Sequence, residues 1–163
     1  MNAGQPKMQS GVEQRRRGEG QSVRILGQLE WKLTREDTAG HYCVLESVLP
    51  PGGGVPPHLH ADQEAVYILE GSMEFARMGS TGLEWFSVSS GDVVNVRGGS
   101  LHGFRNTGAT PSRMLTMGTG GLAAFFEEAG VPVAAGSTPA PPTREEVERV
   151  ITIARKHGHQ FPQ

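Results

Sequence analysis

The chain has 163 residues, with 15 Lys and Arg against 17 Asp and Glu, and a formal charge of −2. This length suits a single domain with a sizeable core, and a nearly neutral chain has no basic field for nucleic acid or an anionic membrane. No apolar run reaches the roughly 18 residues of a membrane span. Cys43 is the single cysteine, which excludes an intrachain disulfide. We therefore expect a cytoplasmic protein without nucleic-acid or membrane partners.

Residues 1–21 are polar, rich in Gly, Gln and Arg, and without hydrophobic periodicity. Such a segment cannot bury enough apolar surface to fold, so it is predicted to be a disordered N-terminal arm. The three arginines at positions 15–17 are too few to define a nucleic-acid site and are expected to be solvated.

Short segments rich in β-forming residues follow from Ser22 onward, separated by turns in which many of the 23 glycines and 11 prolines fall. The predicted strands lie within residues 22–33, 41–49, 55–60, 64–69, 73–78, 83–88, 92–96, 102–106 and 113–119. Short strands at this spacing predict an all-β sandwich or barrel over residues 22–119.

The pattern changes over residues 120–163, where helical periodicity replaces alternation. Residues 122–129 predict a short helix closed by Gly130, and residues 131–142 predict an extended linker. Thr143 and Glu146 have the spacing of a capping box, which opens a second helix ending near Lys156. We expect these helices to pack on the barrel as a cover.

Four residues of the β region have the types and spacing of a metal site. His58 and His60 are alternate residues of an extended segment, so their side chains share a face. A turn at residues 61–63 can bring Glu64 back beside them, and His102 follows in a second strand pair. Imidazole with carboxylate suits Fe, Mn, Co, Ni, Cu or Zn better than Ca or Mg.

The same region resembles the cupin superfamily, whose small barrels carry two motifs. The first, G-x5-H-x-H-x3,4-E-x6-G, is matched completely over residues 52–71. The second, G-x5-P-x-G-x2-H-x3-N, is matched over residues 91–106 except that Arg97 occupies the proline position. That departure affects a turn, because proline would fix its backbone angle, and it removes no ligand.

The resemblance implies a double-stranded β-helix, or jelly-roll, barrel. It further implies that His58, His60, Glu64 and His102 ligate one divalent transition metal. The chain is most similar to single-domain quercetin dioxygenase-like cupins, which implies a metal-dependent dioxygenase of a small aromatic or enolic substrate, with O₂ as co-substrate. Glu64 would then leave the metal to take the substrate's hydroxyl proton as a general base.

Two alternatives remain open at this point. The barrel can serve as a non-catalytic small-molecule sensor or binding protein, or as a metal-dependent isomerase or decarboxylase that uses the cation as a Lewis acid. A homodimer is also expected, because the strand segment over residues 23–33 has an edge that a second copy can pair with.

Strand parity predicts which side chains surround the metal. Val66 shares a face with Glu64, and Phe104 shares one with His102. If Glu74 faces water, Phe75 and Arg77 face inward. The apolar members of this set predict a substrate pocket, and Arg77 is a candidate anchor for an acidic or phenolate group.

The remaining notable residues favour ordinary structural roles. Asn106 is expected to tie a turn by hydrogen bonds, and Cys43 is expected to pack as a small hydrophobe. The other histidines have no companions at ligand spacing and are predicted to be surface groups; these are His41, His157 and His159.

Overall fold

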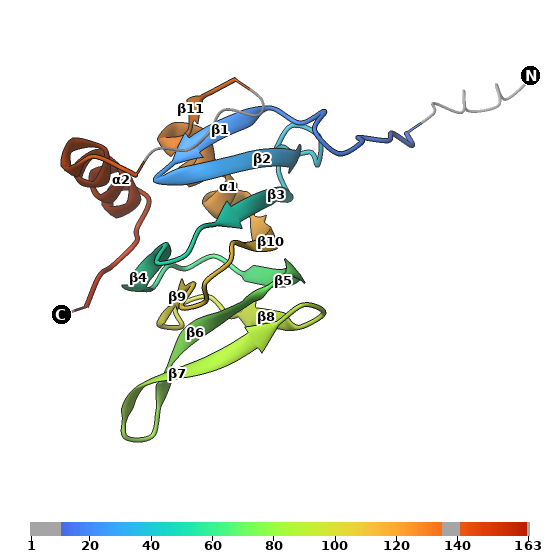
Figure 1. The fold of residues 1–163 in the computed structure, drawn as a ribbon. Helices are drawn as coiled ribbons and strands as arrows, with labels where there is room; N and C mark the ends of the chain where they lie inside the picture. The colour runs from blue at the N-terminus through green and yellow to red at the C-terminus, as the bar shows by residue number, and fades with distance from the viewer. Residues whose placement is uncertain (1–10, 135–140, 163) are drawn as a thin grey trace, which may run out of the picture.

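A computed structural model of the chain describes residues 11–134 and 141–162 (Figure 1). Residues 1–10 of the predicted arm and residues 135–140 of the predicted linker lie outside the described ranges. Within them the chain forms two antiparallel sheets and two helices, which confirms the all-β prediction. No described helix is both long and apolar enough to span a membrane.

The first sheet has seven strands in the order β11-β1-β2-β3-β10-β5-β8, and the second has four in the order β4-β9-β6-β7. The bounds are β1 Ser22–Ile25, β2 Gly27–Leu33, β3 Tyr42–Leu49, β4 Gly54–His58, β5 Glu64–Glu70, β6 Ser72–Gly79, β7 Gly82–Ser89, β8 Val93–Val96, β9 His102–Arg105, β10 Ser112–Thr119 and β11 Val131–Pro132. The helices are α1 Gly120–Ala129 and α2 Arg144–Lys156.

The main core fills the space between the sheets, where alternate residues of each strand point inward. Its members come from β5, β6, β7 and β10 and are at most 6% exposed: Val66, Ile68, Met73, Phe75, Val88 and Met114. The same alternation leaves the other face of the larger sheet at the surface, where Tyr67 on β5 is 38% exposed.

A second core lies where α1 covers strands β1, β2 and β3 of the larger sheet (Figure 1). Trp31, Leu45 and Ala123 pack there around Cys43, which is fully buried as predicted. Burial disfavours the thiolate, so the pKa of Cys43 rises to about 11.

The helix α2 packs on α1 through Val150 and Ala154 and begins with the predicted capping box. The Thr143 hydroxyl accepts from the backbone N–H of Glu146, and the Glu146 carboxylate accepts from the backbone N–H of Thr143. Arg24 on β1 also binds the Glu146 carboxylate at 3.0 Å, which ties the start of α2 to the larger sheet.

Two segments that were expected to be irregular contact the larger sheet. Residues 11–21 run beside β2, where the Gln21 carbonyl accepts from the Trp31 N–H at 3.0 Å, and Arg15 forms an ion pair with Asp37. Val131 and Pro132 form β11 on the outer side of β1.

The pairing removes the reason given for a homodimer. β1 lies between β11 and β2, and β2 lies between β1 and β3, so residues 23–33 offer no free edge. The strand-edge argument is therefore wrong, because the chain's own β11 pairs with the edge that a second copy would need.

Candidate metal centre

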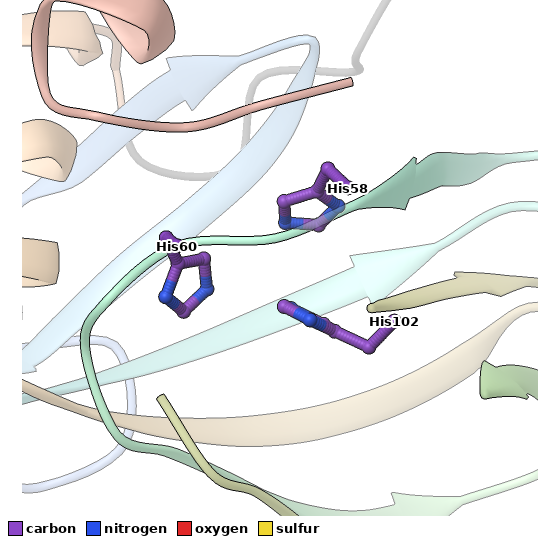
Figure 2. A group of neighbouring side chains, drawn as sticks. All are labelled: His58, His60 and His102. Carbon is purple, nitrogen blue, oxygen red and sulfur yellow. The ribbon is translucent and has the colours of Figure 1, made fainter. Parts of the chain in front are cut away.

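Three histidines predicted as ligands converge between the sheets (Figure 2). His58 ends β4, His60 follows two residues later, and His102 begins β9, where it is the direct antiparallel partner of His58. Their side chains are buried, and one ring nitrogen from each lies within 4.8 Å of the others. Imidazole nitrogens at such separations can reach one cation.

Backbone carbonyls orient two of these rings. Nδ1 of His58 lies 3.0 Å from the Pro56 carbonyl, and Nδ1 of His102 lies 2.9 Å from the Ser100 carbonyl. A carbonyl oxygen only accepts, so each Nδ1 carries the proton and donates it, which leaves the Nε2 lone pair free in the neutral ring. A metal-binding histidine typically donates a hydrogen bond in this way from the ring nitrogen that does not bind the metal.

The nitrogens that face inward have no hydrogen-bond partner in the described structure. Nε2 of His102 and both ring nitrogens of His60 are buried and unpaired. Because buried polar atoms are normally satisfied, a group of unpaired nitrogens around one point is evidence for a ligand there. A divalent transition metal satisfies them, since imidazole suits such ions.

The Glu64 carboxylate is the fourth predicted ligand and lies beside this point. Its Oε2 is 3.3 Å from Nε2 of both His60 and His102, but neither contact has the alignment of a hydrogen bond. Burial opposes its ionisation, yet the two imidazoles outweigh this effect, and the pKa of Glu64 falls to about 2. The carboxylate is thus anionic at neutral pH and next to the three rings.

The other titrating groups respond to the same neighbours. Burial, followed by the nearby His102, lowers the pKa of His58 to about 4. Burial also opposes charge on His102, but the Glu64 carboxylate outweighs it and raises the pKa of His102. The metal-free site therefore favours a neutral His58, while the carboxylate favours the protonated form of His102 more than in a free imidazole.

The turn at residues 61–63, which brings Glu64 back to the histidines, packs closely against Gly98 and Gly99. The N–H of Gly99 donates to the His60 carbonyl at 2.7 Å, and a Cβ added at Gly98 would lie 2.1 Å from the Ala61 carbonyl oxygen. The Asp62 carboxylate accepts from the Thr119 hydroxyl at 2.8 Å. Any side chain at position 98 would displace this turn.

Asn106 ties the far end of the second motif, as predicted. Its side-chain amide donates to the carbonyls of Leu49 and Thr110 at 3.0 and 2.8 Å, and its oxygen accepts from the N–H of Gly108 at 2.9 Å. This buried residue thus fixes a turn and does not face the histidines.

The predicted pocket residues divide into two groups. Val66 and Phe75 are at most 1% exposed, and the Phe104 ring centroid lies 5.4 Å from that of Phe75, so the three form an apolar wall. Arg77 is opposite His102 in the register, but its side chain is 62% exposed and forms an ion pair with Glu84 at 3.3 Å. The structure thus places Arg77 at the surface.

His159 lies beside the histidine cluster, contrary to the prediction from the sequence. It was predicted to be a surface group, but it is 6% exposed, and its ring centroid lies 4.8 Å from that of His60 and 5.7 Å from that of His58. The reason is a pair of backbone hydrogen bonds between Leu59 and Gln160, which brings the end of the chain onto the histidine segment.

Known proteins provide the comparison for this geometry. Residues 45–118 match the family model described as "Cupin domain". A search of curated proteins finds no significant match to the sequence.

Solved structures with the same fold include three with informative descriptions. A protein described as a predicted oxalate decarboxylase from Thermotoga maritima is 26% identical, with a TM-score of 0.55, and the match covers 64% of this chain and 96% of that one. The polyketide cyclase RemF from Streptomyces resistomycificus is 20% identical, with a TM-score of 0.57 and coverage of 83% and 96%. The Cnp3 cupin domain from Schizosaccharomyces pombe is 15% identical, with a TM-score of 0.51 and coverage of 60% and 66%.

The last two structures share the fold alone at their level of identity, and the family model adds the sequence motif that surrounds the histidines. Two facing antiparallel sheets, the matched motif region and the buried histidine cluster agree with one another. Residues 45–118 of the chain therefore form a cupin domain.

Proposed function

We propose that this cupin is a mononuclear metal-dependent dioxygenase of a small aromatic or enolic substrate. The observation that carries the proposal is the histidine cluster. His58 and His102 give their Nδ1 protons to backbone carbonyls, which leaves lone pairs directed at a shared point. With His60 and the Glu64 carboxylate they provide four ligands for one divalent transition metal, which leaves further positions for substrate and O₂.

A metal bound there supplies Lewis acidity, which lowers the pKa of a substrate hydroxyl, and a redox centre for O₂. The chain's own residues decide what happens around it. A carboxylate whose pKa is about 2 is a weak base at neutral pH. We therefore assign Glu64 first as a ligand, and it acts as a proton acceptor only when it moves away from His60 and His102.

The apolar wall supports an aromatic or enolic substrate over a small dianion. Phe104 is partly buried on the face of β9 that carries His102, so it can offer apolar surface to a flat ring, and Val66 and Phe75 pack behind it in the core. Besides the metal, a buried dianion such as oxalate favours a cationic side chain, and Arg77, the strand partner of His102, already pairs with Glu84 at the surface.

A second candidate is a metal-dependent decarboxylase or isomerase of small oxygenated acids. The Thermotoga maritima protein favours it, because that protein is described as a predicted oxalate decarboxylase and this chain covers 96% of its length at 26% identity. Arg77 is the direct strand partner of His102, so a rotation of its side chain away from Glu84 would give an acidic substrate an anchor.

Separate metal loading distinguishes these functions. Protein loaded with Fe, Mn, Ni, Co, Cu or Zn is incubated with flavonols, catechols and enediols while O₂ uptake is recorded. Uptake that needs both a redox metal and substrate supports the dioxygenase. CO₂ release from oxalate or a related acid without O₂ consumption supports the second candidate. A ligand that raises the Tm without turnover identifies a binding protein.

We also propose a homodimer, now through the outer face of the larger sheet. This face exposes Tyr67, Val93 and Met117 by 38–61%. The charges beside them are already compensated, since Arg113 pairs with Glu46 and Glu70 within the chain. A second copy can therefore cover the face without burying an unpaired charge. Light scattering should give twice the mass of the chain, and Val93→Glu should give the monomer.

We also propose a cytoplasmic location, with which the single cysteine of the chain is consistent.

A further inference from the structure

After α2, residues 158–161 form a segment that lies against the predicted ligands, which we call the C-terminal strap. Gly158 takes a positive φ of 80° just after α2 and turns the chain back toward the barrel. Gln160 then exchanges two backbone hydrogen bonds with Leu59, at 3.0 and 2.9 Å. Because Leu59 lies between His58 and His60, the strap is fixed to the metal-binding segment itself.

The strap places two rings against the histidine cluster. The Phe161 ring centroid lies 5.9 Å from that of His58, with an interplanar angle of 27°. The His159 ring lies between the cluster and α1, since its centroid is 4.8 Å from that of His60 and 4.6 Å from that of Phe125.

One nitrogen of the His159 ring has no hydrogen-bond partner among the described residues. Its Nε2 is buried and makes no hydrogen bond in the described structure. A buried unpaired ring nitrogen is costly, and a phenylalanine would pack on Phe125 without that cost. The unpaired nitrogen is therefore evidence for a ligand that binds beside the ring.

The ring also lies outside the set of nitrogens that meet at the metal. Those of His58, His60 and His102 all lie within 4.8 Å of one another, and His159 is not a member of that group. Accordingly, we propose that His159 is a substrate-contacting residue that hydrogen-bonds, through Nε2, the small molecule held by the metal. The strap is the element that delivers it. This inference rests on the metal site of the proposed function.

The test uses Co(II)-loaded protein and azide as the small anionic probe, followed by visible absorption. His159→Phe keeps the ring packing but has no nitrogen, so we expect one cobalt per chain, an unchanged cobalt affinity, and azide binding about tenfold weaker through loss of one hydrogen bond. His159→Gln keeps a side-chain nitrogen and should restore most of the azide affinity. His157→Phe is the matched control, because His157 pairs with Glu128 at the surface, and its azide affinity should equal that of the wild type.

Each other outcome overturns the inference. Azide binding that is the same in His159→Phe as in the wild type reduces His159 to a packing residue. A cobalt affinity that falls more than about 100-fold would make His159 a metal ligand, since substitution of a residue that only contacts the ligands lowers metal affinity by about 10–100-fold. If the wild type takes up no cobalt at all, the proposed function fails as well, and metal analysis alone separates that case from the other two.

Discussion

The two ends of the barrel interior differ sharply in chemistry although the same strands build both. Along the inward face of β5, Glu64 lies at the metal end and Ile68 lies two inward positions further on. On β9 the inward face passes in the same way from His102 to Phe104. One end therefore gathers polar groups without partners, and the other gathers a packed apolar core.

This division separates folding from function. The apolar end removes surface from water and supplies stability. The metal end holds unpaired nitrogens and a buried carboxylate, which cost free energy until a cation is bound. Substitutions at the two ends should therefore change different properties of the protein.

The largest effect is expected for His102→Ala at the metal end. Loss of an inward imidazole should lower metal affinity by more than about 100-fold, because even outer-shell substitutions cost 10–100-fold. Metal analysis after dialysis against a chelator measures this, and His41→Ala, at an exposed position, should retain the wild-type metal content. Equal metal content in both variants would contradict the proposed ligand set.

The converse effect is expected for Phe75→Ala at the apolar end. This ring is 1% exposed at the centre of the core, so its removal should lower the free energy of unfolding by about 3–5 kcal/mol. The fraction that stays folded should still bind one metal. Urea unfolding measures the loss, and Met78→Ala, with Met78 60% exposed, should change stability by less than about 0.5 kcal/mol.

Acid should lower the free energy of unfolding of the metal-free protein, because it protonates histidines that are buried and neutral at the metal end. The pKa values of His58 and His159 are lowered from 6.5 to about 4, so the unfolded chain takes up protons first as the pH falls. Their contribution is present above pH 6.5 and is lost progressively down to about pH 4. At pH 5 the loss is on the order of 2 kcal/mol for each group. The raised pKa of His102 acts in the opposite direction.

Urea unfolding of metal-free protein at pH 7 and pH 5 tests this expectation. His159→Phe should remove its share of the pH dependence, whereas His157→Phe should not. A wild-type protein that is equally stable at both pH values would contradict the expectation that the lowered pKa values of His58 and His159 dominate the pH dependence.

The smallest effect is expected for Arg77→Ala at the rim. The ion pair of Arg77 with Glu84 is largely exposed, so stability should change by less than about 0.5 kcal/mol. Turnover of an aromatic substrate should also change little. A KM for an acidic substrate that rises tenfold or more in this variant would instead favour the decarboxylase or isomerase.

The sequence allowed much of this architecture to be predicted because the information is local. Alternation and the glycines that close the turns predicted most of the strands, and the spacing of the two motifs predicted that His58, His60 and His102 would lie together. His159 could not be found in this way, because a backbone pairing between Gln160 and Leu59 across about 100 residues brings it to the site. The inward register also did not reveal that Arg77, near a strand end, would reach solvent.

Cys43 gives the molecule a built-in reporter of local opening. The thiol is fully buried beneath α1, and it is the single cysteine of the chain. A thiol-modifying reagent can therefore react only with molecules in which α1 has lifted or the whole domain has opened. The rate of Cys43 labelling can be followed by mass spectrometry with and without metal. A slower rate with metal would show that cation binding between the sheets reduces opening at α1.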